Sequence, residues 1–132
     1  MLPLLGRKTQ LLVLDDDPSM QRLLSAILHG AGYRVDVVSS GTLAIEKLAR
    51  TRYAALLLDL MTPTDGGMTV IRHLRNASPA LLRRVVLVTA SPDTILRSVR
   101  AEIAAVVHKP FESHALLDAV ERVLRDDRPD VA

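Results

Sequence analysis

The chain has 132 residues, of which 48% are hydrophobic and 24% charged, which suits one domain with a sizeable core and excludes a disordered protein. Cysteine is absent, which excludes disulfides and thiolate metal sites, and a formal net charge of +2 is too small to indicate nucleic-acid binding. No apolar run is long enough to cross a bilayer.

The first ten residues are predicted to form a loose lead-in. Their apolar stretch is too short for a signal peptide, and Arg7 and Lys8 follow it where basic residues should precede it. We expect the domain over residues 11–125. Residues 126–132 are expected to form a charged tail or the start of a linker.

Two kinds of segment alternate from Leu11 onward. Continuously apolar runs indicate strands buried on both faces, and apolar residues at three- and four-residue spacing indicate helices. In chain order, strands are expected at 11–14, 35–38, 56–58, 85–88 and 103–107, and helices at about 18–30, 42–50, 68–76, 93–101 and 116–124. This alternation predicts a doubly wound α/β domain, a five-stranded parallel sheet with helices on both faces.

Polar residues stand at the carboxyl ends of these strands. Asp15 and Asp16 follow the first strand, Asp59 the third, Thr89 the fourth and Lys109 the fifth. Such ends meet at one edge of a parallel sheet, where open α/β proteins bind ligands. Converging carboxylates repel one another unless a cation joins them, and an all-oxygen set suits Mg²⁺. With a lysine and a threonine beside them, the set indicates phosphoryl transfer to a carboxylate.

Each residue also has a plainer interpretation. A lone Asp59 would be expected to end its strand, Thr89 to be an ordinary strand former, and Lys109 to be solvated. Asp17 is expected to serve the N-terminus of the following helix rather than a metal. Only the combination favours a functional site.

In their order and spacing, four segments resemble the receiver domain of two-component response regulators. They are Leu-Val-Leu-Asp-Asp-Asp-Pro at 12–18, Leu-Leu-Leu-Asp-Leu-Met-Thr-Pro at 56–63, Val-Leu-Val-Thr-Ala at 86–90 and His-Lys-Pro-Phe at 108–111. The resemblance covers about residues 10–124. It implies the flavodoxin-like, CheY-like strand order 2-1-3-4-5.

The resemblance implies a phospho-acceptor and a metal site. Asp59 would be the acceptor, and Asp15, Asp16, Asp59 and the backbone carbonyl of Met61 would hold Mg²⁺. The domain would catalyse only its own phosphorylation and dephosphorylation, as a signalling domain and not a turnover enzyme.

The last two strands would contribute the groups that respond to the phosphoryl group. Thr89 would contact it and shift on its arrival, Lys109 would pair with it, and the bond before Pro110 would be cis. Met61 and Ser91 would flank the site, where the family tunes hydrolysis of the acyl phosphate.

The resemblance also implies partners. The phosphoryl group would come from a histidine kinase or a histidine phosphotransfer protein. The fourth helix, fifth strand and fifth helix would bind a downstream effector protein or domain, or a second copy in a homodimer. We expect a cytoplasmic location and no membrane contact. We also expect no direct nucleic-acid binding, because the arginines between 72 and 100 are accompanied by neither a recognition-helix motif nor interleaved aromatic residues.

Two departures from the family pattern favour an alternative. Val106 stands where the family has its switch aromatic, so a shift of Thr89 cannot be relayed by a large ring. Asp65-Gly66-Gly67 fills a turn in which a bulky apolar residue and then Asp or Ser usually precede the glycine, so we expect a local change there. The alternative is a receiver-like interaction module with weak or no phosphorylation switching. A phosphatase of the haloacid dehalogenase type is more distant, because that family carries its nucleophile on the first strand.

Overall fold

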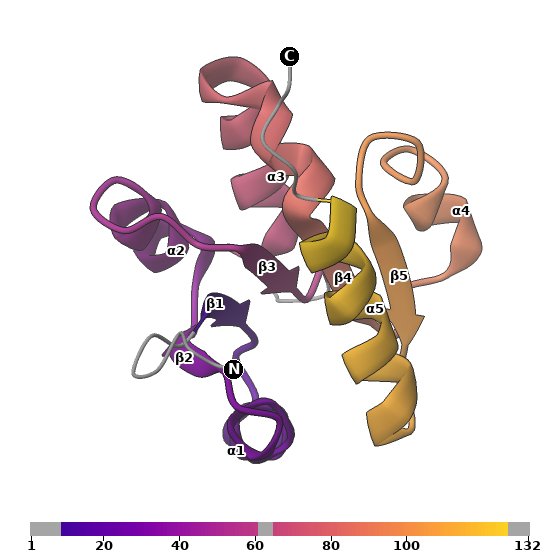
Figure 1. The fold of residues 1–132 in the computed structure, drawn as a ribbon. Coiled ribbons are helices and arrows are strands. Elements are labelled where there is room, and N and C mark those ends of the chain that lie inside the picture. Colours follow the sequence, from indigo (N-terminus) through magenta and orange to yellow (C-terminus); the bar gives the residue numbers. More distant parts are fainter. Residues whose placement is uncertain (1–8, 61–64, 127–132) are drawn as a thin grey trace.

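The computed structural model describes residues 9–60 and 65–126, which form a single parallel sheet with helices on both faces (Figure 1). The strands run in the order β2-β1-β3-β4-β5, so the predicted fold class and strand order are confirmed. Their bounds are β1 (Gln10–Leu14), β2 (Arg34–Val38), β3 (Ala55–Leu58), β4 (Val85–Thr89) and β5 (Ala105–His108). The central strands β1, β3 and β4 are almost wholly buried, as their unbroken apolar sequences predict.

The helices divide between the two faces of the sheet. They are α1 (Pro18–Gly30), α2 (Gly41–Leu48), α3 (Gly67–Ala77), α4 (Asp93–Leu96) and α5 (Ser113–Asp126), with a short 3₁₀ helix, η1 (Pro79–Arg84), that was not predicted. Helices α1 and α5 pack on one face and α2, α3 and α4 on the other. Among the described residues, no helix is long and apolar enough to cross a membrane.

The hydrophobic core has two halves because successive strand residues point to opposite faces. In β1, for example, Leu11 and Val13 join the half beneath α1 and α5, whereas Leu12 and Leu14 join the half beneath α2 and α3. These four side chains are at most 1% exposed. The packed sheet holds the strand ends, and hence the residues that follow them, at fixed positions.

The predicted fourth helix is too long. Periodicity indicated a helix over 93–101, but α4 ends at Leu96 and gives way to turns. Beyond Leu96 the backbone bonds become turn-like, since the Ser98 amide donates to the carbonyl of Ile95 at 3.3 Å and the Val99 amide to that of Leu96 at 3.1 Å, each only three residues back. The result is a one-turn α4 between the carboxyl end of β4 and β5.

Candidate functional site

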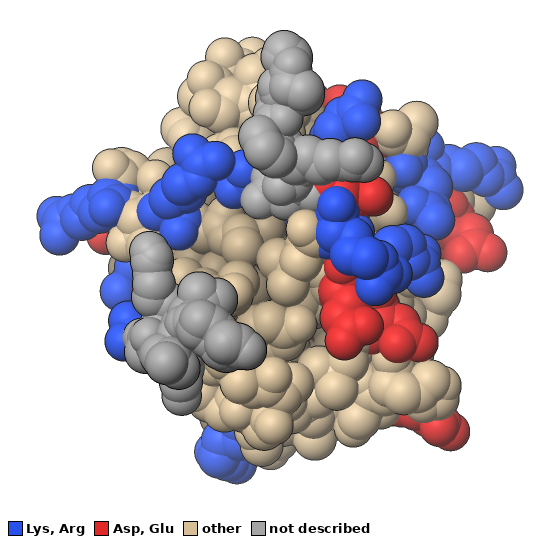
Figure 2. Space-filling view, in the orientation of Figure 1, with Lys and Arg blue, Asp and Glu red and all other residues tan. Residues whose placement is uncertain are grey.

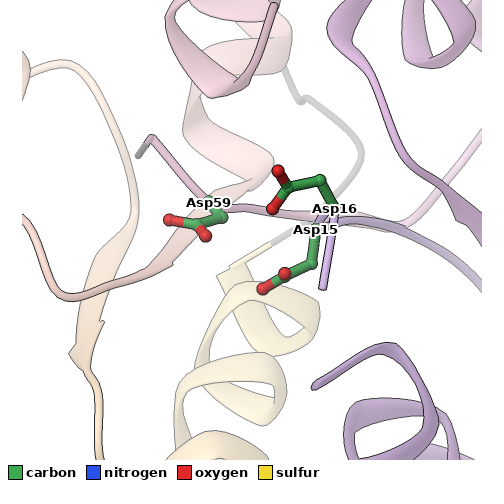
Figure 3. Close-up of side chains that lie close together, drawn as sticks. All are labelled: Asp15, Asp16 and Asp59. Atoms are coloured by element: carbon green, nitrogen blue, oxygen red, sulfur yellow. The ribbon is translucent and has the colours of Figure 1, made fainter. Parts of the chain in front are cut away.

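Three carboxylates converge at the carboxyl edge of the sheet. Asp15 and Asp16 leave the end of β1, Asp59 leaves the end of β3, and one carboxylate oxygen from each lies within 4.8 Å of the others (Figure 3). Asp15 and Asp59 are buried, whereas Asp16 is exposed. The predicted acids therefore lie together, in a cluster that solvent reaches from the side of Asp16.

The backbone fixes Asp59 from two directions. Its amide donates to the carbonyl of Leu14, at 3.0 Å, and its carbonyl accepts from the amide of Gly67, at 2.9 Å. A Cβ atom on Gly67 would lie 2.9 Å from the Asp59 carbonyl oxygen, so this approach requires glycine. Asp59 is thus held against both β1 and the start of α3.

The β1–α1 loop fixes Asp15 in a similar way. Its amide donates to the carbonyl of Val38, at 3.2 Å, and its Oδ1 accepts from the amide of Asp17, at 2.9 Å. The side-chain amide of Gln21 donates to the carbonyl of Asp15. Sequence reasoning missed Gln21, whose only signal was its place in the first turns of α1. Asp17 caps α1 through Ser19, at 3.1 Å, so its predicted helix-terminal role is confirmed.

Lys109 joins the cluster from the end of β5. Its Nζ donates to Asp15 Oδ2 at 2.7 Å and to Asp59 Oδ2 at 3.0 Å. Burial alone would lower the pKa of Lys109, but these hydrogen bonds and the two negative charges outweigh it and raise the pKa above its ordinary value. The lysine is therefore charged and partly neutralises the acids. The bond between Lys109 and Pro110 is cis, as predicted.

Thr89 ends β4 with its hydroxyl paired to a second buried hydroxyl. Its Oγ1 lies 3.0 Å from Ser91 Oγ and accepts from the Ser91 amide at 3.2 Å. Thr89 is fully buried and Ser91 is 3% exposed. The β4–α4 loop thus begins with a hydroxyl pair that connects the end of β4 to the residues before α4.

Comparison with known families identifies the chain. The family model described as the response regulator receiver domain matches residues 11–121. The chain belongs to this family. The match agrees with the sheet order, the acid cluster and the lysine described above.

Curated relatives and solved structures agree with this assignment. The receiver domain is 35% identical over 126 residues to the DNA-binding response regulator MtrA of Mycolicibacterium smegmatis, an alignment that covers 92% of this chain and 54% of MtrA. The chain therefore spans about half the length of the curated relatives it matches. It is also similar to the receiver domain of the sensor histidine kinase PA1611 from Pseudomonas aeruginosa PAO1, with a TM-score of 0.80, 27% identity and coverage of 90% and 99%.

A second solved structure, a sensor protein from Polaromonas sp. JS666, aligns with the receiver domain at a TM-score of 0.79 and 29% identity, covering 89% of this chain and 97% of that one. The PA1611 structure has a magnesium ion coordinated in its active-site cleft. In the present chain the acid cluster fits such an ion, because hard divalent cations prefer carboxylate oxygens and three are within reach of one point.

Two further predictions concern Met61 and Val106. Met61, the predicted carbonyl ligand, lies outside the described residues. Val106 lies in β5, is partly buried and packs against the core half beneath α2, α3 and α4. A valine there supplies much less volume than an aromatic ring.

Proposed function

We propose that this receiver domain accepts a phosphoryl group on Asp59 from a phosphohistidine of a histidine kinase or histidine phosphotransfer protein. The observation that carries the proposal is the contact of one ammonium group, that of Lys109, with both Asp59 and Asp15. A purely structural ion pair needs one carboxylate, and burial of a second carboxylate beside it, with an exposed third one nearby, is costly without a further cation or ligand. The arrangement suits a site that exchanges charged groups.

The transfer forms one bond and breaks one. An oxygen of the ionised Asp59 carboxylate bonds to phosphorus as the P–N bond to the donor imidazole breaks. The electron pair of that bond stays on nitrogen, and the imidazole departs neutral when its other nitrogen carries a proton. Hydrolysis later returns Asp59 to a carboxylate, with water bonding to phosphorus and inorganic phosphate leaving.

The chain's own groups position and neutralise the transferred group. Asp15, Asp16 and Asp59 would hold Mg²⁺, with the Met61 carbonyl as a further proposed ligand, and the ion would offset negative charge on the phosphoryl oxygens. Lys109 would turn from the carboxylates to a phosphoryl oxygen. Thr89 would donate its hydroxyl proton to another. Catalysis of this kind rests on placement and charge, and it is limited to the domain's own phosphorylation and dephosphorylation.

The output surface is proposed to be the face formed by α4, β5 and α5. A groove of about 490 Å³ lies between β5 and α5, and its lining contains the apolar Val106 and Phe111 beside the charged Asp118 and Arg122. On α4, Ile95 is 42% exposed. A partner with an apolar contact strip fits this face, either an effector protein or domain or a second copy of the chain.

Charge argues against nucleic acid as the direct partner of this domain. Figure 2 shows acidic and basic side chains beside one another over α5, so the side of this helix seen there carries both signs of charge. The relative MtrA is described as a DNA-binding response regulator, and the alignment covers 54% of it. If residues 11–125 belong to a longer protein, we propose that a DNA-binding output domain accompanies them there. Transfer from a histidine kinase would place the domain in the cytoplasm.

The deciding experiment is the intact mass after incubation with acetyl phosphate, in Mg²⁺ and in EDTA. We expect one added phosphoryl group that requires Mg²⁺ and disappears in Asp59→Asn. Asp17→Asn is the matched control, because it removes a neighbouring acid that caps α1 and leaves the three clustered acids in place. Labelling that survives in Asp59→Asn would exclude Asp59 as the acceptor.

The alternative, an interaction module with weak or no switching, is favoured by Val106 in place of the family's aromatic. Beryllofluoride with Mg²⁺, which mimics an acyl phosphate without hydrolysis, separates the two functions. Saturable binding that shifts the amide NMR signals of residues on α4 and β5 supports the switch. Binding confined to the acid cluster, or no binding, supports the interaction module.

A further inference from the structure

Asp65, in the turn where this chain departs from the family pattern, is bonded to the start of α2. Its Oδ2 accepts from the Thr42 amide at 3.0 Å and from the Thr42 hydroxyl at 2.7 Å, and its carbonyl accepts from the Gly41 amide at 2.9 Å. A Cβ atom on Gly41 would lie 2.6 Å from Asp65 Oδ1. The turn and the helix therefore meet at a close contact that only glycine allows.

The other side of this turn leads to the phospho-acceptor. Gly67, two residues after Asp65, donates its amide to the carbonyl of Asp59, and the amide of Asp59 donates to the carbonyl of Leu14. A displacement of Asp65 would therefore act on the backbone of Asp59 through a short, hydrogen-bonded path.

The start of α2 is in turn connected to Asp15. The Asp15 amide donates to the carbonyl of Val38, the last residue of β2, and Gly41 follows shortly after. Together these links form a closed ring of hydrogen bonds and short chain segments through Asp15, the start of α2, Asp65 and Asp59. The carboxylate of Asp65, together with the backbone bond from the Gly41 amide to the Asp65 carbonyl, joins the β2–α2 side of the ring to the β3–α3 side.

We propose that Asp65 is a positioning residue for the acid cluster, setting the separation of Asp59 from Asp15 through this ring. The inference rests on the proposed function, since the cluster is taken as the metal and acceptor site. Residues that orient metal ligands typically affect metal affinity by about 10- to 100-fold. Asp65 touches neither the metal nor the reacting atoms, so its effect is expected at the lower end.

The test compares Asp65→Ala with Ser40→Ala. Both remove a hydrogen bond to an amide in the first turn of α2. Ser40 Oγ accepts from the Leu43 amide at 3.2 Å, a bond between the N-cap of α2 and its own first turn, whereas Asp65 Oδ2 accepts from the Thr42 amide across the gap between the β3–α3 turn and α2. We expect Asp65→Ala to weaken Mg²⁺ binding, measured by calorimetry, about tenfold, and Ser40→Ala to leave it within about twofold. Asp65→Asn, which keeps an oxygen acceptor, should fall between wild type and Asp65→Ala.

Amide hydrogen exchange without metal gives a second readout. In Asp65→Ala the amides of Gly41 and Gly67 should lose protection, while in Ser40→Ala only amides within α2 should do so. Equal effects of the two variants on Mg²⁺ affinity and on Gly67 exchange would overturn the positioning role. A wild-type protein that does not bind Mg²⁺ would instead overturn the proposed function, and the Gly67 exchange would still decide whether the ring exists.

Discussion

Lys109 Nζ lies 2.7 Å from Asp15 Oδ2 and 3.0 Å from Asp59 Oδ2, so one ammonium joins the ends of three strands. The lysine side chain is 17% exposed and the Asp15 carboxylate 1%, which places the pair where solvent screens it weakly. In this arrangement the lysine offsets the repulsion between the carboxylates. Lys109 and a divalent cation would therefore neutralise the same two carboxylates, those of Asp15 and Asp59, and compete for them.

Replacing Lys109 with Ala should strengthen metal binding while weakening the metal-free fold. The variant loses two charge-assisted hydrogen bonds, which should cost about 2 kcal/mol of unfolding free energy without Mg²⁺. The cluster then carries one more uncompensated negative charge, so Mg²⁺ affinity should rise about tenfold. Calorimetry and urea unfolding measure the two effects. Lys47→Ala, at an exposed position on α2, is the control. A loss of Mg²⁺ affinity in Lys109→Ala would show that the lysine supports the metal rather than competing with it.

Removal of the Ser91 hydroxyl should release Thr89 from its resting partner. Thr89 Oγ1 and Ser91 Oγ lie 3.0 Å apart and either can be the donor, so their hydrogen bond occupies the Thr89 hydroxyl that an incoming phosphoryl oxygen would otherwise engage. We expect Ser91→Ala to bind beryllofluoride about threefold more tightly, and to lose about 1 kcal/mol of stability from the lost buried hydrogen bond. Ser98→Ala, whose hydroxyl bonds within the exposed segment after α4, should change neither affinity nor the Thr89 environment. Weaker beryllofluoride binding in Ser91→Ala would instead indicate that Ser91 orients the Thr89 proton towards the ligand.

Much of the fold and the composition of the acid cluster could be predicted, because parallel topology alone decides which residues meet. Any polar residue at the carboxyl end of a strand must lie at the same edge of the sheet, so Asp15 and Asp59 had to be neighbours once both strands were recognised. The contact of Lys109 with Asp15 joins residues 94 apart in the sequence. The geometry of this contact depends on the conformation of the lysine side chain and on the register of β5 against β4. The hydrophobic periodicity of the sequence predicts neither of them.

The contacts between loops could not be predicted. Asp65 was recognised as a departure from the family pattern, but its bond to Thr42 depends on how two turns approach each other in space. Beyond Leu96 the backbone likewise changes to bonds between residues three apart, a local change that an apolar pattern at helical spacing does not reveal.

Gly41 and Gly30 should respond oppositely to alanine. A methyl group at Gly41 would lie 2.6 Å from Asp65 Oδ1 and 2.7 Å from the Gly66 carbonyl, so Gly41→Ala should cost about 1–3 kcal/mol through forced displacement of the turn. At Gly30, the last residue of α1, nothing lies within 4 Å of the added carbon, and Gly30→Ala should gain about 0.5–1 kcal/mol from reduced unfolded-state entropy. Urea unfolding measures both. An unchanged free energy of unfolding in Gly41→Ala would mean that the β3–α3 turn can move away from the added methyl group without loss of stability.

Tyr53 should make stability fall at high pH. Burial, followed by the hydrogen bond to Asp36 and the charge of that carboxylate, raises the pKa of Tyr53 from 10.0 to about 12. The native state therefore retains the phenol proton more strongly than the unfolded chain does, and this stabilisation is complete below pH 10 and is lost as the pH rises through 12. The chain has two tyrosines, so Tyr33→Phe isolates Tyr53 for titration by phenolate absorbance. We expect a midpoint near 12 and, in urea unfolding, a decline above pH 10 that Tyr53→Phe largely removes. A midpoint near 10 in the folded Tyr33→Phe protein would contradict the burial of Tyr53 and its hydrogen bond to Asp36 as the cause of the raised pKa.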